Sequence, residues 1–111
     1  MIKKMFGLFF KKKESDLDGQ QFKTQYLAAK SHVLLDVRTA GEFQSGSLPT
    51  ATNMDVMAAD FKSKMDKLDQ SKTYYVFCRS GNRSGNAVSM MKNAGFNAFN
   101  LVGGINAFPA N

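Results

Sequence analysis

The sequence predicts one α/β domain, with a parallel sheet covered by helices on both faces. Short apolar runs alternate along the chain with stretches of helical periodicity, and such alternation favours parallel strands joined by right-handed crossovers. The 111 residues suffice for one hydrophobic core but not for two. A hydrophobic content of 43%, with 10 phenylalanines, favours a folded globule over a disordered chain.

The first half of the chain contains two predicted helices and two predicted strands. Residues 16–30 have helical spacing and begin with two aspartates that could cap a helix, Asp16 and Asp18. Residues 33–37 form an apolar run typical of a buried strand. Thr39 and Glu42 have the spacing of a capping box and predict a short helix, and residues 51–54 predict a small strand.

The second half continues the same alternation. Residues 57–68 predict an amphipathic helix and residues 73–78 a strand. Residues 85–94 predict a helix that ends before a glycine, and residues 98–102 predict the last strand. A Gly-Gly pair then leads into a short terminal helix. In parallel sheets of this kind, ligands bind beyond the carboxyl ends of the strands, where Asp36 and Cys78 are expected to lie.

The positive charge is concentrated at the amino terminus. Residues 1–13 contain five lysines and no acid, whereas the net charge of the whole chain is +6. The remainder is therefore nearly neutral, and we expect no nucleic-acid partner. The apolar run among these lysines is too short for a signal peptide or a spanning helix. We treat residues 1–14 as an extension and residues 15–111 as the domain. Two interpretations of residues 1–13 stay open: a poorly ordered tail, or weak contact with a membrane surface. We expect a cytoplasmic protein, at most peripheral at the inner membrane surface.

Cys78 is the only cysteine and His32 the only histidine. One cysteine cannot form an intramolecular disulfide, and the pair cannot supply the four ligands of a typical structural zinc site. We expect neither a metal nor a cofactor.

Cys78 ends a predicted strand and opens a loop with the composition of an anion-binding site. The segment reads Cys78-Arg79-Ser80-Gly81-Asn82-Arg83-Ser84. Its small residues tolerate the tight backbone of a nest of inward-pointing amides, the following helix adds its positive end, and two arginines add charge. All of these favour the nucleophilic thiolate. The competing interpretation, a buried apolar cysteine, is the commonest role of a free cysteine.

The sequence resembles the single-domain rhodaneses, a family of sulfurtransferases. Four blocks carry the resemblance: Leu35-Asp36-Val37-Arg38 with Glu42-Phe43; Ser45-Gly46-Ser47-Leu48-Pro49; the segment from Cys78 to Ser84; and Gly95-Phe96 with Leu101-Val102-Gly103-Gly104-Ile105. The resemblance covers about residues 16–109. It implies a rhodanese-like three-layer α/β sandwich with a central parallel sheet of about five strands.

The resemblance also implies a reaction. Cys78 would take the sulfane sulfur of a small anionic donor such as thiosulfate and carry it as a persulfide. An external acceptor, cyanide or a thiol, would then remove that sulfur, because the chain has no second cysteine. The loop residues are expected to bind the substrate: Arg79, Ser80, Gly81, Asn82, Arg83 and Ser84. We expect both arginines to attract the donor. We prefer a helix-capping role for Ser84 over a bond to the sulfur.

Three further residues are expected to give structural support. Arg38 and Glu42 are four positions apart and could pair, and Asp36 could brace the active loop through its backbone. The sequence departs from the family pattern where Ser47 and Thr50 replace the usual histidine and glycine, so no role for a histidine is carried over. Phe108 replaces the usual tryptophan of the terminal helix, which is a change of packing.

Two alternative functions are also compatible with the sequence. Phosphatases and arsenate reductases on the same scaffold place five residues between the cysteine and the arginine, whereas four separate Cys78 from Arg83. The shorter loop favours a sulfur atom over a tetrahedral oxyanion. The second alternative is a sulfur carrier or binding module loaded by a sulfur-relay protein, which would use the same cysteine. Neither the donor and acceptor in the cell nor the oligomeric state follows from the sequence.

Overall fold

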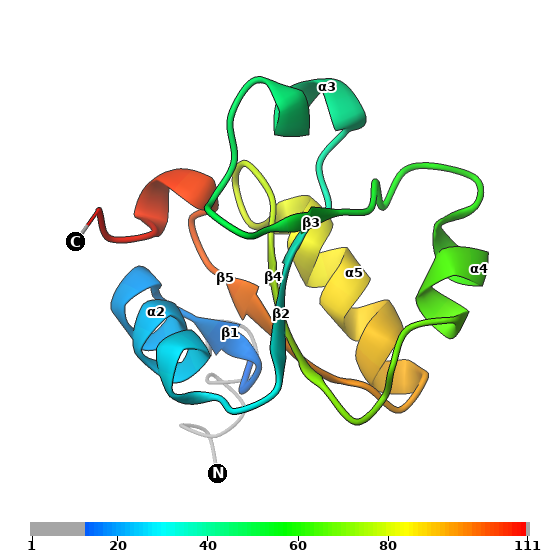
Figure 1. Cartoon of the computed structure of the whole chain (residues 1–111), viewed down its shortest axis with the longest axis horizontal. Helices are drawn as coiled ribbons and strands as arrows, with labels where there is room; N and C mark the ends of the chain where they lie inside the picture. The colour runs from blue at the N-terminus through cyan, green and yellow to red at the C-terminus, as the bar shows by residue number, and fades with distance from the viewer. Residues whose placement is uncertain (1–12, 111) are drawn as a thin grey trace, which may run out of the picture.

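The computed structural model describes residues 13–110, which form a three-layer α/β sandwich (Figure 1). The middle layer of this part of the chain is a sheet of five parallel strands in the order β1-β5-β4-β2-β3. The strands are β1 (Asp16–Leu17), β2 (His32–Asp36), β3 (Thr52–Asn53), β4 (Thr73–Phe77) and β5 (Asn97–Leu101). The predicted fold class is therefore confirmed.

Helices cover both faces of this sheet. They are α2 (Gly19–Ala28), α3 (Ala40–Gln44), α4 (Phe61–Asp66), α5 (Asn82–Asn93) and the 3-10 helix η1 (Ile105–Ala107). Figure 1 shows α2 and η1 on one side of the sheet, α4 and α5 on the other, and α3 at the edge that β2 points to. Among the described helices, none is long and apolar enough to cross a membrane. The two interpretations of residues 1–13, a poorly ordered tail or weak membrane contact, stay open, because residues 1–12 lie outside the described part of the chain.

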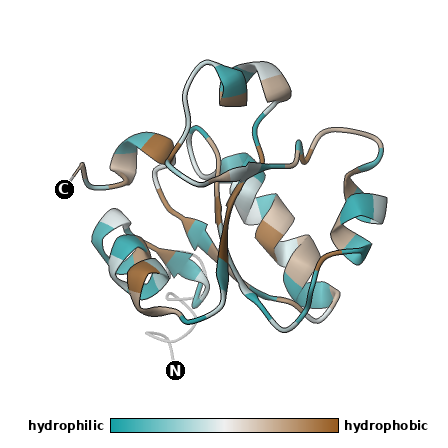
Figure 2. Ribbon diagram, viewed as in Figure 1, coloured by the Kyte–Doolittle hydropathy of each residue, from teal (hydrophilic) through white to brown (hydrophobic). Residues whose placement is uncertain are grey.

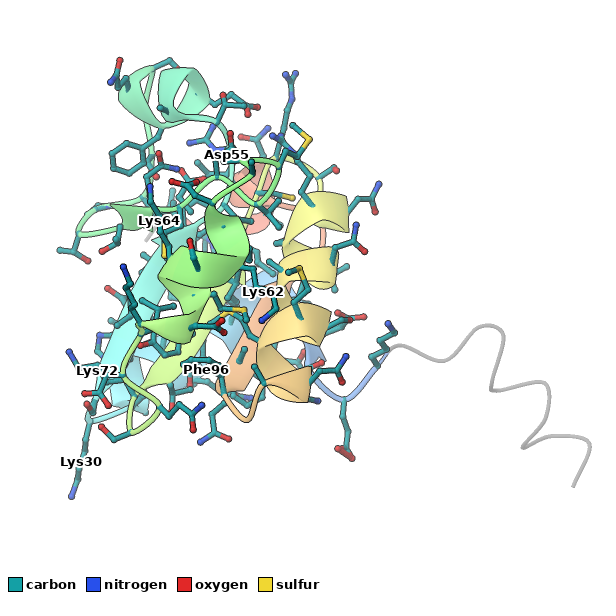
Figure 3. All side chains as sticks on the ribbon, turned by 90° about the vertical axis from the view of Figure 1, so that its right-hand side faces the viewer. Lys30, Asp55, Lys62, Lys64, Lys72 and Phe96 are labelled. Carbon is teal, nitrogen blue, oxygen red and sulfur yellow. The ribbon has the colours of Figure 1, made fainter. Side chains whose placement is uncertain are left out.

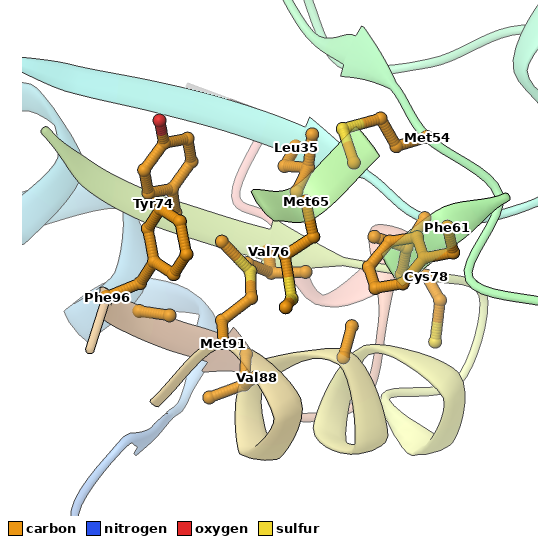
Figure 4. Packing of buried hydrophobic residues seen from close by; sticks show 13 residues of the cluster. Leu35, Met54, Phe61, Met65, Tyr74, Val76, Cys78, Val88, Met91 and Phe96 are labelled. Carbon is orange, nitrogen blue, oxygen red and sulfur yellow. The ribbon is translucent and has the colours of Figure 1, made fainter. Parts of the chain in front are cut away.

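Each face of the sheet has its own hydrophobic core, and β4 supplies both because successive side chains of a strand point to opposite faces. Tyr74 and Val76 pack towards α4 and α5, whereas Tyr75 and Phe77 pack towards α2. Figure 2 shows that the central strands are among the most hydrophobic segments. Cys78 belongs to the first core and lies at one end of its row of apolar side chains (Figure 4).

The amino-terminal boundary differs from the prediction. Asp16 and Leu17 do not begin a helix but form β1, which pairs with the carboxyl end of β5. Helix α2 begins after Asp18, whose carboxylate accepts a hydrogen bond from the backbone amide of Gln21. A two-residue strand is too short to show alternation, so its pairing partner alone reveals it.

Helix α4 is shorter than the predicted 57–68. The carboxylate of Asp55 accepts a hydrogen bond from the backbone amide of Met57. This local turn competes with helix formation at the start of the predicted segment, before Phe61. The predicted inward face is correct, because Phe61 and Met65 are buried. Lys62 lies on the solvent side and pairs with Asp66 of the same helix (Figure 3).

Thr50 is the only non-glycine residue with positive φ among residues 13–110, at 67°. A β-branched residue in the left-handed region is strained. We expect Thr50→Gly to raise the free energy of unfolding by about 1 kcal/mol. Urea denaturation would measure the change. As a control, Thr24→Gly inside the exposed face of α2 should lower stability by a few tenths of a kcal/mol, roughly. A destabilised Thr50→Gly variant would show that the strain account is wrong.

Candidate active site

The site forms where β2 and β4 end side by side. Asp36 and Phe77 are register partners at the last positions of the two strands, and the amide of Val37 donates to the carbonyl of Phe77 at 3.0 Å. Arg38, two residues after β2, and Cys78, directly after β4, therefore emerge at the same edge. This is the edge at which such sheets bind ligands.

The sulfur of Cys78 lies inside a cradle of hydrogen-bond donors. The backbone amide of Gly81 is 3.1 Å from Sγ and that of Ser84 is 3.4 Å away. Gly81 makes this possible with a left-handed φ of 99°, and α5 begins directly after it. The helix therefore starts close to the thiol, earlier than the predicted residue 85. Its positive end favours an anion at this position.

The environment of Cys78 acts on the pKa of its thiol in two opposing directions. The residue is fully buried, and burial raises the pKa of the thiol. Hydrogen bonds from the Ser84 hydroxyl and from the amides of Ser84, Gly81 and Ser80 lower that pKa, and the net shift is downward. The site thus favours the thiolate, which is the nucleophilic form of cysteine.

Ser84 does not cap α5, contrary to the sequence-based preference. Gly81 occupies the N-cap position and Ser84 lies within the first turn, so its side chain points back to the sulfur. The hydroxyl oxygen is 3.3 Å from Sγ and 2.6 Å from Oδ1 of Asn100. Asn100 is a site residue that the sequence reasoning missed, because its place opposite the loop depends on the pairing of β4 with β5.

The two arginines of the loop have different surroundings. Arg83 donates two hydrogen bonds to Glu42, with N–O distances of 2.7 and 3.0 Å. This ion pair raises the pKa of Arg83 and lowers that of Glu42 to about 2. Arg79 is exposed and forms no ion pair within the described part of the chain. Donor binding by both arginines stays a prediction, but only Arg79 has its whole charge available.

The support residues pair differently from the prediction. Arg38 does not pair with Glu42; its guanidinium instead donates to the buried carboxylate of Asp36 at 2.8 to 3.2 Å. Ser47 donates to the same carboxylate at 2.7 Å, and Arg38 also donates to the carbonyl of Gly46. No hydrogen bond of Asp36 in the described structure reaches residues 78–84. Through Arg38 and Ser47, Asp36 therefore stabilises the segments on either side of α3. Glu42 of that helix in turn forms the ion pair with Arg83 of the active loop.

Replacing Glu42 with glutamine tests the ion pair to Arg83. Because the folded-state pKa of Glu42, about 2, lies below its ordinary value of 4.5, the pair stabilises the fold above pH 4.5. That contribution is lost as the pH falls towards 2. We expect the wild-type chain to be more stable than Glu42→Gln at neutral pH and the two to converge in acid. Urea denaturation across this pH range would measure it. A constant gap would exclude the charge as its cause.

These features define the class of the protein: an α/β domain with a cysteine thiol in an anion-binding loop beyond its parallel sheet. The chain belongs to the rhodanese-like domain family, whose model matches residues 20–111. The resemblance read from the sequence is thereby confirmed. Among residues 13–110, no group of three or more His, Cys, Asp or Glu side chains could hold a metal ion.

Known relatives agree with this assignment. YtwF of Bacillus subtilis, a candidate sulfurtransferase, is 37% identical over 75 residues, which cover 68% of this chain and 71% of that protein. The adenylyltransferase and sulfurtransferase MOCS3 of Arabidopsis thaliana is 29% identical over 115 residues, covering 88% of this chain. The chain spans only 24% of that larger protein. The crystal structure of a rhodanese-like domain protein from Staphylococcus aureus superposes with a TM-score of 0.73 at 25% identity, covering 86% of this chain and 91% of that one.

Proposed function

We propose that this chain is a sulfurtransferase that carries a sulfane sulfur on Cys78. The observation that carries the proposal is the cradle itself, in which the Gly81 and Ser84 amides converge on the only thiol. Such donors stabilise the thiolate before transfer and a bound anion during it. The sulfurtransferase names of its relatives support a role as a transferase or a sulfur carrier.

The proposed reaction has two half-reactions. The Cys78 thiolate attacks the outer sulfur of thiosulfate, and the sulfur–sulfur bond of the donor breaks with its electron pair leaving on sulfite. The enzyme is left as Cys78–S–S⁻. Cyanide or an external thiolate then attacks the outer sulfur, and the bonding electron pair returns to Sγ as the thiolate. Sulfur and charge balance in each step. Because the first product leaves before the acceptor binds, the kinetics should be ping-pong.

Thiocyanate formation from thiosulfate and cyanide tests this function. Initial rates at several fixed cyanide concentrations should give parallel double-reciprocal lines against thiosulfate. Intersecting lines would exclude a free persulfide enzyme. Hydrolysis of an aryl phosphate by the same preparation would instead support the phosphatase alternative, which the engagement of Arg83 by Glu42 disfavours.

Arg79 is proposed to attract the anionic donor, because its charge is exposed and unpaired within residues 13–110. We expect Arg79→Gln to raise the KM for thiosulfate about tenfold while kcat changes little, since one charge-assisted contact is worth about 1.5 kcal/mol. Initial-rate kinetics would measure both constants. Lys30→Gln is the matched control, because Lys30 (Figure 3) carries the same charge but precedes the start of β2, whereas Arg79 follows the end of the parallel strand β4. Equal effects of the two variants would mean that net charge, not Arg79, draws the donor.

A sulfur carrier loaded by a partner protein is the second candidate. It is favoured by the complete burial of Cys78 and by MOCS3, in which a domain like this one occupies about a quarter of a larger protein. A cysteine desulfurase supplied with cysteine would load Cys78 in this case, while thiosulfate would give no turnover above the Cys78→Ser background. Turnover with thiosulfate alone would favour the independent enzyme.

A further inference from the structure

A polar chain runs from the surface of β1 to the buried sulfur, and the proposed reaction does not account for it. The amide nitrogen of Asn100 donates to the carboxylate of Asp16 at 3.0 Å and to the carbonyl of Gly81 at 3.3 Å. Two acceptors on the nitrogen side fix the orientation of the amide. Its oxygen therefore faces Ser84, whose hydroxyl lies between Asn100 and the Cys78 sulfur.

The Ser84 hydroxyl has one hydrogen and two neighbouring acceptors. The distance to Oδ1 of Asn100 is 2.6 Å and the distance to Sγ of Cys78 is 3.3 Å. Ser84 and Asn100 are both buried, so water cannot replace a lost bond at low cost. If the hydrogen turns to the thiolate, the oxygen of Asn100 loses its partner. If it stays with Asn100, the thiolate faces a hydroxyl lone pair.

We propose that Asn100, oriented by Asp16, is a positioning residue that competes with the Cys78 sulfur for the hydroxyl hydrogen of Ser84. Asn100 thereby restrains formation of the free thiolate. A persulfide carries its negative charge chiefly on the outer sulfur. Sγ then no longer competes with Asn100 as an acceptor for the Ser84 hydroxyl hydrogen. The network consequently favours the sulfur-loaded state relative to the free thiolate. This reading rests on Cys78 being the reactive sulfur of the proposed function.

Other charges near the thiol act independently of this hydrogen. They are Arg79 beside the cysteine, Arg83 on α5 with its partner Glu42 on α3, and Asp55 before α4, whose charge acts on Arg83. None of them donates to or accepts from Ser84 or Asn100 in the described structure. A test must therefore separate the hydrogen-bond effect from a general change in charge or packing.

The ultraviolet absorbance of the thiolate, followed against pH, reports Cys78 alone once the matching Cys78→Ser titration is subtracted. Asn100→Ala should move the midpoint down by about one pH unit, because Ser84 can then donate fully to the sulfur. In a Ser84→Ala background, Asn100→Ala should leave the midpoint unchanged. No shift with Ser84 present, or the same shift without it, would overturn the proposal.

Asp16→Ala is a second variant that does not disturb the buried amide itself. It removes one of the two acceptors that orient Asn100, so the expected shift has the same direction and a smaller size. The shift should again require Ser84, whereas an effect of the lost charge alone would persist in Ser84→Ala and contradict the assignment. The titration needs no sulfur donor, so it stands or falls separately from the sulfur-transfer assay.

Discussion

Cys78→Ser is expected to reduce thiocyanate formation to the uncatalysed rate, a loss on the order of a thousandfold or more. A serine oxygen cannot carry a sulfane sulfur, and a hydroxyl ionises far less readily than a thiol. The fold should persist, because the amides of Gly81 and Ser84 can donate to an oxygen in place of Sγ. We expect stability to change by only about 1 kcal/mol.

The measurement compares steady-state rates of the two proteins at equal concentration, with circular dichroism and urea denaturation as controls for folding. Turnover by a folded Cys78→Ser protein near the wild-type rate would rule out the persulfide route. Loss of activity with loss of structure would require comparison with a second isostere, Cys78→Ala, under the same conditions.

Gly104→Ala is expected to displace the loop that follows Cys78, because Gly104 packs against the backbone of Arg79 and Ser80. Gly104 follows β5 with φ 79° and ψ −168°, a conformation that essentially only glycine adopts. An added Cβ would overlap the carbonyl group of Arg79 and lie 2.6 Å from the amide nitrogen of Ser80. The next residue, Ile105, donates from its backbone amide to the carbonyl of Cys78 at 2.8 Å. The glycine therefore lets the two backbones meet directly at the thiol.

We expect Gly104→Ala to lower the free energy of unfolding by about 3 kcal/mol and kcat/KM by on the order of a hundredfold, because even a small displacement of a reactive group is costly. Gly41→Ala is the matched control. A Cβ at Gly41 in α3 meets nothing within 4 Å, so its effect on stability should be neutral or favourable by about 0.5 kcal/mol. Wild-type activity in Gly104→Ala would show that the turn does not position the loop.

The sequence predicted most of what depends on local chemistry. Thr39 and Glu42 form the capping box that their spacing indicates, with the Thr39 hydroxyl accepting from the Glu42 amide. Gly95 ends α5 with a left-handed φ of 97°. The apolar run that ends at Cys78 also placed this residue at the carboxyl edge of the sheet. Each of these features is encoded within a few neighbouring residues.

What the sequence could not predict depends on pairing between distant segments. Spacing favoured an ion pair between Arg38 and Glu42. In the structure Arg38 pairs instead with the buried carboxylate of Asp36. Glu42 pairs with Arg83, which is 41 residues away in the sequence. Burial decides this choice, because leaving the buried Asp36 carboxylate without a cationic partner would cost about 3–5 kcal/mol. Asn100 was missed for a similar reason, since nothing near it in the sequence marks a contact with Ser84.

The most direct test of the central claim is the intact mass of the purified chain after incubation with thiosulfate and removal of the excess. The account predicts a gain of one sulfur atom per chain, which is lost on addition of cyanide or dithiothreitol and never forms in Cys78→Ser. An unchanged mass in the wild-type protein, or a gain that survives in Cys78→Ser, would contradict it.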